Sequence, residues 1–389
     1  MPTPTGLKLP PDHDNIALVL QGGGALGAYQ AGVYAELFKT RFQPNWVAGV
    51  SIGAVNAALI AGNPAQRRLE RLTEFWELVS SGLLAPAPDG DLYRRLFNRG
   101  SAAAAAVSGV PGFYDPRVPP PFLQPAGTTA ALSFYDTAPL RQTLLRLVDF
   151  DLINSGRVRL SVGAVNLRSG NSQYFDNQHL RIGVEHILAS CALPPAFAPV
   201  SIGDDAFWDG GIVTNTPLQY VLDERATADR LLVFQVDLFS ARGPMPADLG
   251  EVLQRHKDIL YSSRTRFATD RAKALHNSLL AVCTLLKELP PKFRNDPRVE
   301  MLAAMTELAP TDIVHLIYRN KRYELESKDY EFSRASVREH WLAGESDMAA
   351  TIAHPERLKQ SGMDEGVTVY DLDSAVQRVA RAEHSSVSD

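Results

Sequence analysis

The sequence has 389 residues, of which 45% are hydrophobic and 21% charged, and its formal net charge is −5 at pH 7. A chain of this length and composition can build the core of a globular enzyme, and its negative charge argues against a general nucleic-acid-binding protein. No apolar run reaches the roughly 18 residues that a membrane-spanning helix needs. Residues 1–15 are polar and rich in proline, without the basic start and apolar centre of a signal peptide, so we expect a flexible tail.

The first predicted elements are a strand, a glycine-rich turn and a helix. Residues 16–20 form an apolar run typical of a buried strand, and residues 28–39 repeat apolar side chains at helical spacing. Three consecutive glycines, Gly22, Gly23 and Gly24, stand between them. Consecutive glycines can direct their backbone N–H groups into one small space, as an oxyanion hole requires.

A second strand, turn and helix follow directly. A short apolar strand leads into the sequence GVSIG at residues 49–53, and small residues at 54–61 predict a helix. In this pattern a sharp turn lifts the Ser51 hydroxyl clear of the sheet, while Gly49 and Gly53 remove Cβ atoms that would clash. Ser51 would then lie at a helix N-terminus, which favours negative charge. If the two strands are parallel neighbours, both turns lie at the same edge of the sheet.

Both turns also have other interpretations. The pattern G-x-S-x-G is often an ordinary strand-to-helix turn. Gly22, Gly24 and Gly27 fit the G-x-G-x-x-G fingerprint of dinucleotide-binding folds. Such folds need an acidic residue at the end of the second strand, about 20 residues further on. The serine turn occupies that position here, which counts against a nicotinamide-dependent oxidoreductase.

The composition of the sequence changes in the middle of the chain. Residues 65–80 predict an amphipathic helix, but prolines interrupt residues 82–137 so often that this segment cannot be one continuous helix or strand. We interpret it as a long surface excursion or as a cap over the site. Its aromatic side chains either line an acyl channel or fix the excursion to the body: Phe113, Tyr114, Phe122, Phe134 and Tyr135.

Regular structure resumes with a helix that Asp136 is expected to cap. Two strands and a helix follow, and a strand–turn–strand pattern at residues 200–208 leads into Asp209-Gly210-Gly211. A carboxylate before two glycines often only shapes a tight turn. Beside the two earlier motifs, however, a catalytic role for Asp209 is favoured.

The last third of the chain contains no chemical motif. We expect the strand at residues 231–236 to complete the sheet, and leucines at helical spacing predict long helices after residue 239. A further strand is predicted at residues 313–318, and two short helices at 333–343 and 346–353. Basic residues among these helices are interleaved with acids, as on a solvated face, with attraction to anionic lipid the less favoured interpretation.

Taken together, the glycine turn, the serine turn and the Asp-Gly-Gly sequence resemble the patatin-like phospholipases and acyl hydrolases. Residues 189–197 before the aspartate, and Asn215 and Pro217 after the glycines, are similar to the same family. One departure is Leu26, where many members carry Arg or Lys, and it weakens any claim of electrostatic help for a phosphate headgroup. The resemblance is to a bacterial member with a C-terminal helical extension.

The resemblance implies a three-layer α/β/α fold with a mainly parallel central sheet and a mostly helical C-terminal extension. It implies a Ser-Asp dyad, with Ser51 as nucleophile and Asp209 as base, and no cofactor or metal. The glycines divide into oxyanion donors (Gly22, Gly23, Gly24) and residues that support the motifs (Gly27, Gly49, Gly53, Gly210, Gly211). The implied substrate is a lipid or other acyl ester, met in the cytoplasm or peripherally at a membrane or lipid surface, and the oligomeric state is left open.

The expected domain organisation follows from these motifs. It comprises a tail (residues 1–15), a catalytic domain (16–239) with the cap excursion (82–137), a mainly helical extension (240–380) and a loose tail (381–389). The two cysteines, Cys191 and Cys283, are expected to remain reduced thiols in apolar surroundings.

Two further alternatives remain. A Ser-His-Asp esterase would take its histidine from His256, His276 or His315. These histidines lie on predicted helix or strand stripes, and that fold places more strands before its serine than fit before residue 51. The other alternative is a non-catalytic scaffold whose helical extension binds a partner or a membrane, which a fluorophosphonate probe would distinguish because it labels only an active serine.

Overall fold

The computed structural model describes residues 13–225, 229–293, 296–306, 309–354 and 367–371. Its strands are β1 (Asn15–Leu20), β2 (Trp46–Val50), β3 (Asp115–Pro116), β4 (Tyr135–Asp136), β5 (Arg159–Asn166), β6 (Ser172–Asp176), β7 (Val200–Ile202), β8 (Asp205–Asp209), β9 (Leu231–Asp237), β10 (Thr311–Ile317) and β11 (Val367–Asp371). Within the described residues, nine strands form one sheet in the order β11-β10-β9-β1-β2-β5-β8-β7, with β6 also paired to β5. The strands from β11 to β5 are parallel, and the pairs that involve β6, β7 or β8 are antiparallel.

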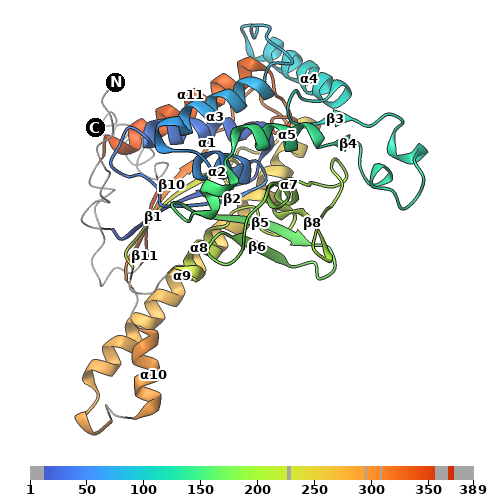
Figure 1. The fold of residues 1–389 in the computed structure, drawn as a ribbon. Coiled ribbons are helices and arrows are strands. Elements are labelled where there is room, and N and C mark those ends of the chain that lie inside the picture. The colour runs from blue at the N-terminus through green and yellow to red at the C-terminus, as the bar shows by residue number, and fades with distance from the viewer. Residues whose placement is uncertain (1–12, 226–228, 294–295, 307–308, 355–366, 372–389) are drawn as a thin grey trace, which may run out of the picture.

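Helices cover both faces of this sheet (Figure 1). They are α1 (Gly27–Leu37), α2 (Ile52–Ala61), α3 (Ala65–Val79), α4 (Asp91–Ser108), α5 (Ala138–Leu147), α6 (Phe150–Asn154), α7 (Val184–Ser190), α8 (Leu218–Glu224), α9 (Leu249–Glu288), α10 (Pro297–Met305) and α11 (Arg334–Ile352). The helices α1, α2, α3 and α11 lie on one face, and α8 lies on the other, where α9 passes beside it. The predicted α/β class with a mainly parallel sheet and C-terminal helices is therefore confirmed.

Strand β1 shows why the core has two halves. Ile16, Leu18 and Leu20 pack into the cluster that includes α1, α2, α3 and α11, whereas Ala17 and Val19 pack against α8. Alternate side chains of a strand point to opposite faces, so a strand covered on both faces needs an unbroken apolar run. The run of apolar residues in β1 follows from this burial.

The sheet order brings the two sequence motifs together. Strands β1 and β2 are parallel neighbours, with Leu20 opposite Gly49. The glycine turn follows β1 and the serine turn follows β2, so both lie at the same edge of the sheet, as the sequence predicts. Crevices at the carboxyl ends of parallel strands are the usual ligand sites of such folds.

The excursion at residues 82–137 is more regular than its prolines suggest. It contains the 18-residue helix α4, whose last turns hold the alanine run. Pro86 and Pro88 precede this helix and Pro111 follows it, so prolines bound the helix and do not interrupt it. The helix after the excursion begins at Ala138 with Thr137 as its cap residue, although Asp136 Oδ1 accepts a hydrogen bond from the Ala138 N–H (3.2 Å).

The C-terminal third contributes to the central sheet. The prediction that residues 231–236 complete the sheet is wrong, because β10 and β11 extend it beyond β9. The predicted strand at residues 313–318 is confirmed as β10. The two short helices predicted near the C-terminus are one continuous helix, α11. The expected boundary at residue 239 thus falls within one shared sheet.

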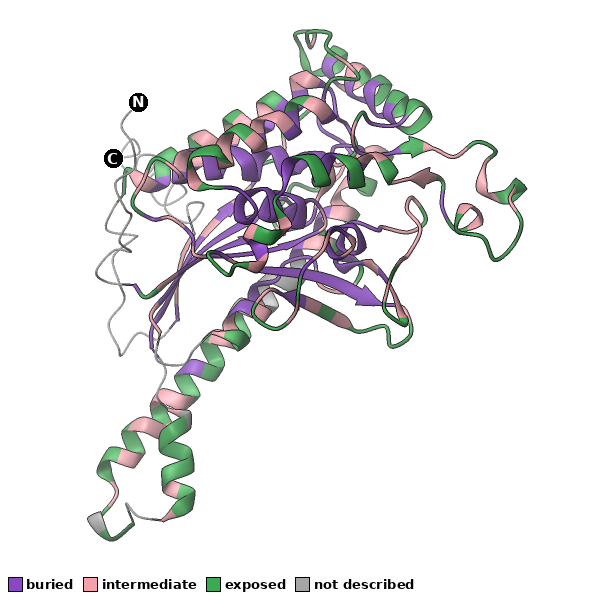
Figure 2. Cartoon of the chain, in the orientation of Figure 1, coloured by how far each residue is buried: buried purple, intermediate pink, exposed green. Residues whose placement is uncertain are grey.

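Two segments lie at the margins of the fold. The later part of α9 and α10 form an arm that extends from the body, with many exposed positions (Figures 1 and 2). Near the N-terminus, His13 is buried with Nε2 3.2 Å from Asp312 Oδ2, and Asn15 begins β1, so the end of the expected tail belongs to the fold. The rest of that tail, residues 1–12, and the tail at 381–389 lie outside the described residues.

Candidate active site

Ser51 lies in the turn between β2 and α2, and its backbone is strained. Its φ and ψ are 56° and −126°, and it is the only non-glycine residue with positive φ in the described part of the chain. Such strain persists only where the surroundings enforce it, and it clusters at functional sites. The Ser51 N–H donates to Ser190 Oγ (2.9 Å), and the Ser190 hydroxyl donates to the Gly163 carbonyl oxygen (2.6 Å). Hydrogen bonds through α7 and β5 therefore hold this turn.

Glycines around Ser51 let neighbouring backbones touch. A Cβ atom on Gly49 would overlap the backbone of Gly53, and a Cβ atom on Gly53 would overlap the carbonyl group of Leu20. A Cβ atom on Gly27 would lie 2.6 Å from a side-chain carbon of Ile52. These glycines shape the packing of β1, β2, α1 and α2 and do not face the cavity described below.

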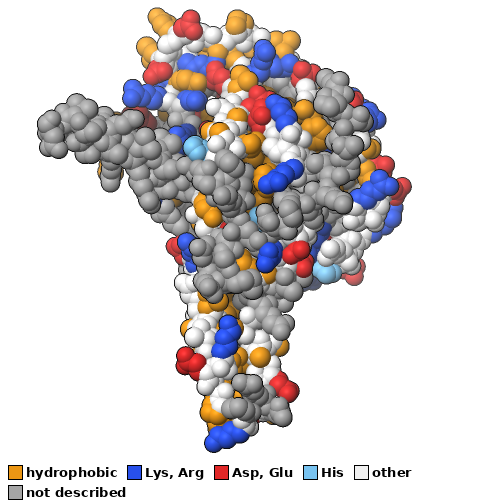
Figure 3. All heavy atoms as spheres, turned by 90° about the vertical axis from the view of Figure 1, so that its left-hand side faces the viewer, with side chains coloured by type: hydrophobic (Ala, Val, Ile, Leu, Met, Phe, Trp, Pro, Cys, Tyr) orange, Lys and Arg blue, Asp and Glu red, His pale blue; other side chains and the backbone are white. Residues whose placement is uncertain are grey.

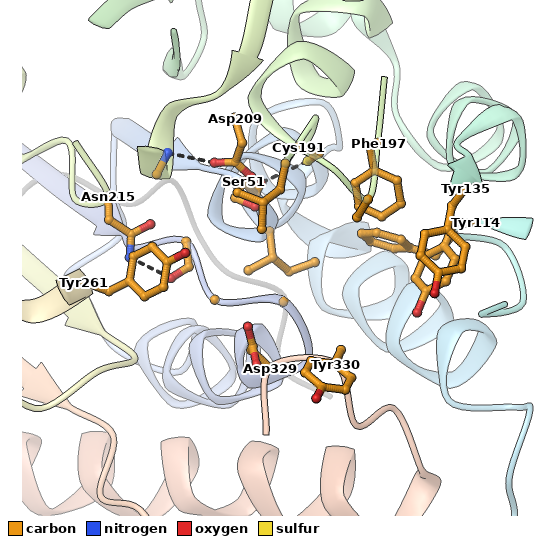
Figure 4. A pocket seen from close by; sticks show the side chains of 18 of the residues that line it. Ser51, Tyr114, Tyr135, Cys191, Phe197, Asp209, Asn215, Tyr261, Asp329 and Tyr330 are labelled. Atoms are coloured by element: carbon orange, nitrogen blue, oxygen red, sulfur yellow. Dashed lines mark hydrogen bonds between the residues drawn. The ribbon is translucent and has the colours of Figure 1, made fainter. Parts of the chain in front are cut away.

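Asp209 ends β8 and is buried, with 2% of its surface exposed. Its Oδ1 accepts a hydrogen bond from the Gly211 N–H (2.7 Å). Burial raises the pKa of Asp209 to about 7, although hydrogen bonds from the Ser51 side chain and the Gly211 amide act to lower it. A Cβ atom on Gly210 would lie 2.6 Å from the Gly163 carbonyl oxygen, so a side chain there would press on β5. The structure brings Asp209 and Ser51 side by side (Figure 4).

The glycine turn after β1 presents two unoccupied amides. The Gly22 N–H donates to the Asn215 carbonyl oxygen (3.1 Å), and Asn215 Nδ2 donates back to the Gly22 carbonyl oxygen (3.0 Å; Figure 4). This differs from the prediction that three glycine amides face a common acceptor, because the Gly22 N–H is already used. No group among the described residues accepts a hydrogen bond from the N–H of Gly23 or Gly24. Both residues line the same cavity as Ser51.

A cavity of about 430 Å³ joins these groups. Its size is typical of small-molecule sites. Eight aromatic residues contribute to its wall in the described part of the chain: Phe113, Tyr114, Tyr135, Phe197, Phe239, Tyr261, Tyr330 and Phe332. The charged side chains in this described lining are Asp209 and Asp329, and no Lys, Arg or His is among them. An apolar wall beside a serine and a buried carboxylate suits the acyl chain of an ester.

The C-terminal third supplies one wall of this cavity, although no motif in its sequence indicates such a role. Asp329, Tyr330 and Phe332 lie in the segment between β10 and α11. The Asp329 carbonyl oxygen accepts a hydrogen bond from the Ala25 N–H (2.8 Å), next to the glycine turn. Lys257 of α9 holds the Asp329 carboxylate, with Nζ 2.7 Å from Oδ1. No local sequence pattern marks these contacts, because each joins residues far apart in the chain.

The histidines of the triad alternative lie elsewhere. His256, His276 and His315 are not among the described residues that line the cavity. His315 Nε2 instead lies 2.6 Å from Asp237 Oδ2, at the end of β9. The described cavity therefore places a carboxylate, and no imidazole, beside Ser51.

Cys191 also borders the cavity. Its thiol donates to the Ser51 carbonyl oxygen (3.2 Å), and burial, together with the nearby Asp209 charge, raises the pKa of the thiol well above its ordinary value. A thiol that stays protonated is a weak nucleophile. Within the described residues, no group of three or more His, Cys, Asp or Glu side chains is placed to hold a metal ion.

Comparison with protein families decides the classification. A family model described as patatin-like phospholipase matches residues 18–222, more than half of the chain. The chain belongs to the patatin-like phospholipase family. A second model, described as patatin phospholipase, matches residues 259–364, so the family's sequence features continue into the C-terminal third. Membership in the patatin-like phospholipases implies hydrolysis of lipid esters.

Solved structures show only distant likeness to this patatin-like phospholipase. VipD from Legionella pneumophila is 14% identical with a TM-score of 0.34, covering 87% of this chain and 67% of its own. Human GIVD cytosolic phospholipase A2 is 11% identical with a TM-score of 0.36, covering 89% and 60%. The ExoU–SpcU complex of the Pseudomonas aeruginosa type III secretion system is 16% identical with a TM-score of 0.29, covering 92% and 74%. A search of curated proteins finds no match.

In the ranges that the structure describes, no helix of this patatin-like phospholipase combines the length and the apolar character needed to cross a bilayer.

Proposed function

We propose that this protein is a serine acyl hydrolase that cleaves carboxylic esters of lipids through an acyl-enzyme, with Ser51 as nucleophile and Asp209 as base. One observation carries the proposal: the strained Ser51, the buried Asp209 and the unoccupied amides of Gly23 and Gly24 border a single apolar cavity. Nucleophile, base and oxyanion donors within mutual reach are the minimum that acyl transfer needs. We place its action in the cytoplasm at the surface of a lipid phase.

The proposed reaction has two steps. Asp209 accepts the hydroxyl proton as Ser51 Oγ attacks the ester carbonyl carbon, and the amides of Gly23 and Gly24 bind the oxyanion. Protonated Asp209 then gives its proton to the departing alcohol. A water molecule, deprotonated by Asp209, attacks the acyl-enzyme, and Asp209 returns the proton to the departing Ser51 Oγ as the fatty acid is released. No metal or cofactor takes part in this scheme.

The raised pKa of Asp209 supports its role as base. A carboxylate with an ordinary pKa is a poor proton acceptor for a serine hydroxyl, whereas a pKa of about 7 suits proton transfer near neutral pH.

The test compares wild type, Ser51→Ala and Asp209→Asn on a panel of phospholipids, lysophospholipids, glycerides and soluble acyl esters, with products measured by mass spectrometry. We expect both variants to lose at least about 10³-fold in kcat, because each removes a group that acts in both steps. A fluorophosphonate probe should label wild type at Ser51 and leave Ser51→Ala unlabelled. Full activity or labelling in Ser51→Ala would overturn the proposal.

A further inference from the structure

The second part of the excursion, residues 100–135, is almost free of charged side chains. Between Arg99 and Asp136, only Asp115 and Arg117 are charged, whereas a segment of this length at the chain's average of 21% would carry about eight charges. Arg117 is already engaged, since its Nε donates to Ser133 Oγ (3.0 Å) and its guanidinium lies 3.8 Å from Asp136. We call residues 118–134, which contain no charged side chain, the uncharged loop.

The uncharged loop exposes large apolar side chains. It stands out from the body between β3 and β4 (Figures 1 and 2). The exposed fractions are 89% for Val118, 77% for Phe122 and 67% for Leu123, and Leu132 and Phe134 are also about half exposed. Exposed apolar side chains gathered in one segment mark a surface that contacts another protein or a membrane. By contrast, the face shown in Figure 3 carries Lys, Arg, Asp and Glu side chains mixed together.

The base of the uncharged loop is part of the cavity wall. Strands β3 and β4 pair at its two ends, and the Tyr135 N–H donates to the Ala196 carbonyl oxygen (2.9 Å). Tyr135 and Ala196 both line the cavity, and so does Ala106, whose carbonyl oxygen accepts a hydrogen bond from the Tyr135 hydroxyl (2.8 Å). Phe134, which is adjacent to Tyr135 in the chain, and Val107, which is adjacent to Ala106, are exposed. Apolar surface therefore continues from the cavity wall to the outside of the molecule.

We propose that the uncharged loop inserts into the surface of an uncharged lipid phase, such as a bilayer of zwitterionic phospholipid, and so places the cavity over its substrate. The delivery of substrate to the cavity rests on the proposed function, but the binding of the loop to lipid does not depend on catalysis. Attraction to anionic lipid requires exposed Lys or Arg, and neither the loop nor the described cavity lining provides one. Insertion of apolar side chains is driven by the area removed from water and needs no charge on the lipid.

The test measures binding of the full chain, as Ser51→Ala, to phosphatidylcholine vesicles by sedimentation at low and high salt. The variant Val118→Ser/Phe122→Ser/Leu123→Ser removes three exposed side chains that do not line the cavity. The control Leu275→Ser/Leu285→Ser removes two exposed leucines from α9, which are 58% and 65% exposed. We expect the loop variant to bind at least about tenfold more weakly, since three apolar side chains are no longer removed from water on binding. The control should bind as the parent does, and salt should have little effect.

A second measurement separates this proposal from the proposed function. When Ser51 is retained, the loop variant should hydrolyse a soluble short-chain ester at a rate within about twofold of the wild-type rate. It should lose most of its hydrolysis of lipid in vesicles. Unaltered vesicle binding by the loop variant would overturn the proposal. The proposal would also be wrong if the parent protein failed to bind phosphatidylcholine vesicles, or bound only anionic vesicles at low salt. If only the α9 control lost binding, the lipid contact would lie on the arm and the proposal would be wrong. Vesicle binding without hydrolysis of any ester would instead count against the proposed function.

Discussion

At the scale of single residues, the site depends on a carboxylate held in surroundings that disfavour its charge. Asp209 is 2% exposed, and the hydrogen bonds from Ser51 and Gly211 do not offset its desolvation, so its pKa is raised to about 7. The same burial that makes Asp209 a stronger base makes the ionised protein less stable. This opposition between activity and stability gives two predictions.

The first prediction concerns the pH dependence of activity. Only ionised Asp209 can accept the Ser51 proton, so kcat/KM should rise with pH through about 7 and level off above it. The rate of fluorophosphonate labelling should follow the same curve, because it depends on the same proton transfer. Activity that stays constant from pH 5 to pH 8 would contradict the assignment of Asp209 as base.

The second prediction concerns the stability of Asp209→Asn. The raised pKa means that the folded protein holds the proton more tightly than the unfolded chain, so wild-type stability falls as pH rises from about 4 to about 7. Asparagine carries no charge and keeps an acceptor for the Gly211 N–H. At pH 8 the variant should therefore be more stable than wild type by on the order of 2–4 kcal/mol in urea denaturation. The difference should shrink towards pH 4, and a variant less stable than wild type at pH 8 would refute the burial argument.

At the scale of elements, the glycine turn is fixed from two directions. Asn215 binds Gly22 from the loop after β8, and the Asp329 carbonyl oxygen binds the Ala25 N–H from the segment before α11. Gly24 has a φ of 55°, and a Cβ atom there would overlap the Asp329 carbonyl group. At Gly23, a Cβ atom would instead meet the Leu238 side chain at 2.7 Å. Backbone cannot move aside as a leucine side chain can.

The third prediction follows from this difference. Gly24→Ala should lower kcat by about 10²- to 10³-fold, since displacing the turn disrupts the oxyanion donors. Gly23→Ala should have a smaller effect, because Leu238 can adopt another rotamer. Both variants are compared with wild type on a soluble ester, and circular dichroism checks that each is folded. If both variants lost kcat equally, the overlap with the Asp329 carbonyl group would not be the reason that Gly24 is needed.

At the scale of the whole molecule, the C-terminal third is part of the core that supports the site. Strand β10 lies beside β9, and α11 packs along α1, the helix that follows the glycine turn. A Cβ atom on Gly344 would overlap the Tyr29 carbonyl group, and one on Gly32 would overlap that of Trp341. The two helices approach closely because each has a glycine where they meet.

The fourth prediction compares the effect of a glycine-to-alanine substitution on stability at two positions. Gly344→Ala should destabilise the protein by about 1–3 kcal/mol, because the added methyl group forces α1 and α11 apart. Gly100→Ala, in α4 where no atom lies within 4 Å of the added Cβ, should instead stabilise by about 0.5–1 kcal/mol through helix propensity. Thermal denaturation of both variants provides the comparison. A Gly344→Ala variant as stable as wild type would mean that α11 contributes little to the folded core.

The sequence alone determined the features that depend on neighbouring residues. Apolar runs specified β1 and β2, the glycines specified the turns after them, and GVSIG indicated an exposed serine at a helix N-terminus. The order of the three motifs indicated the family, and the sheet order then confirmed that the turns after β1 and β2 share one edge. Local patterns sufficed here because the conformation of a tight turn is set by the residues within it.

Tertiary structure alone decided the features that depend on distant residues. Asn215 occupies the Gly22 amide, which leaves two amides unoccupied in the glycine turn. Asp329, more than 300 positions from Gly24, closes the cavity from the C-terminal third, and β10 and β11 extend a sheet that appeared complete at β9. No periodicity or motif records these contacts, because a backbone hydrogen bond or a strand pair can be made by almost any residue type. Their partners are chosen only when the whole chain folds around a common core.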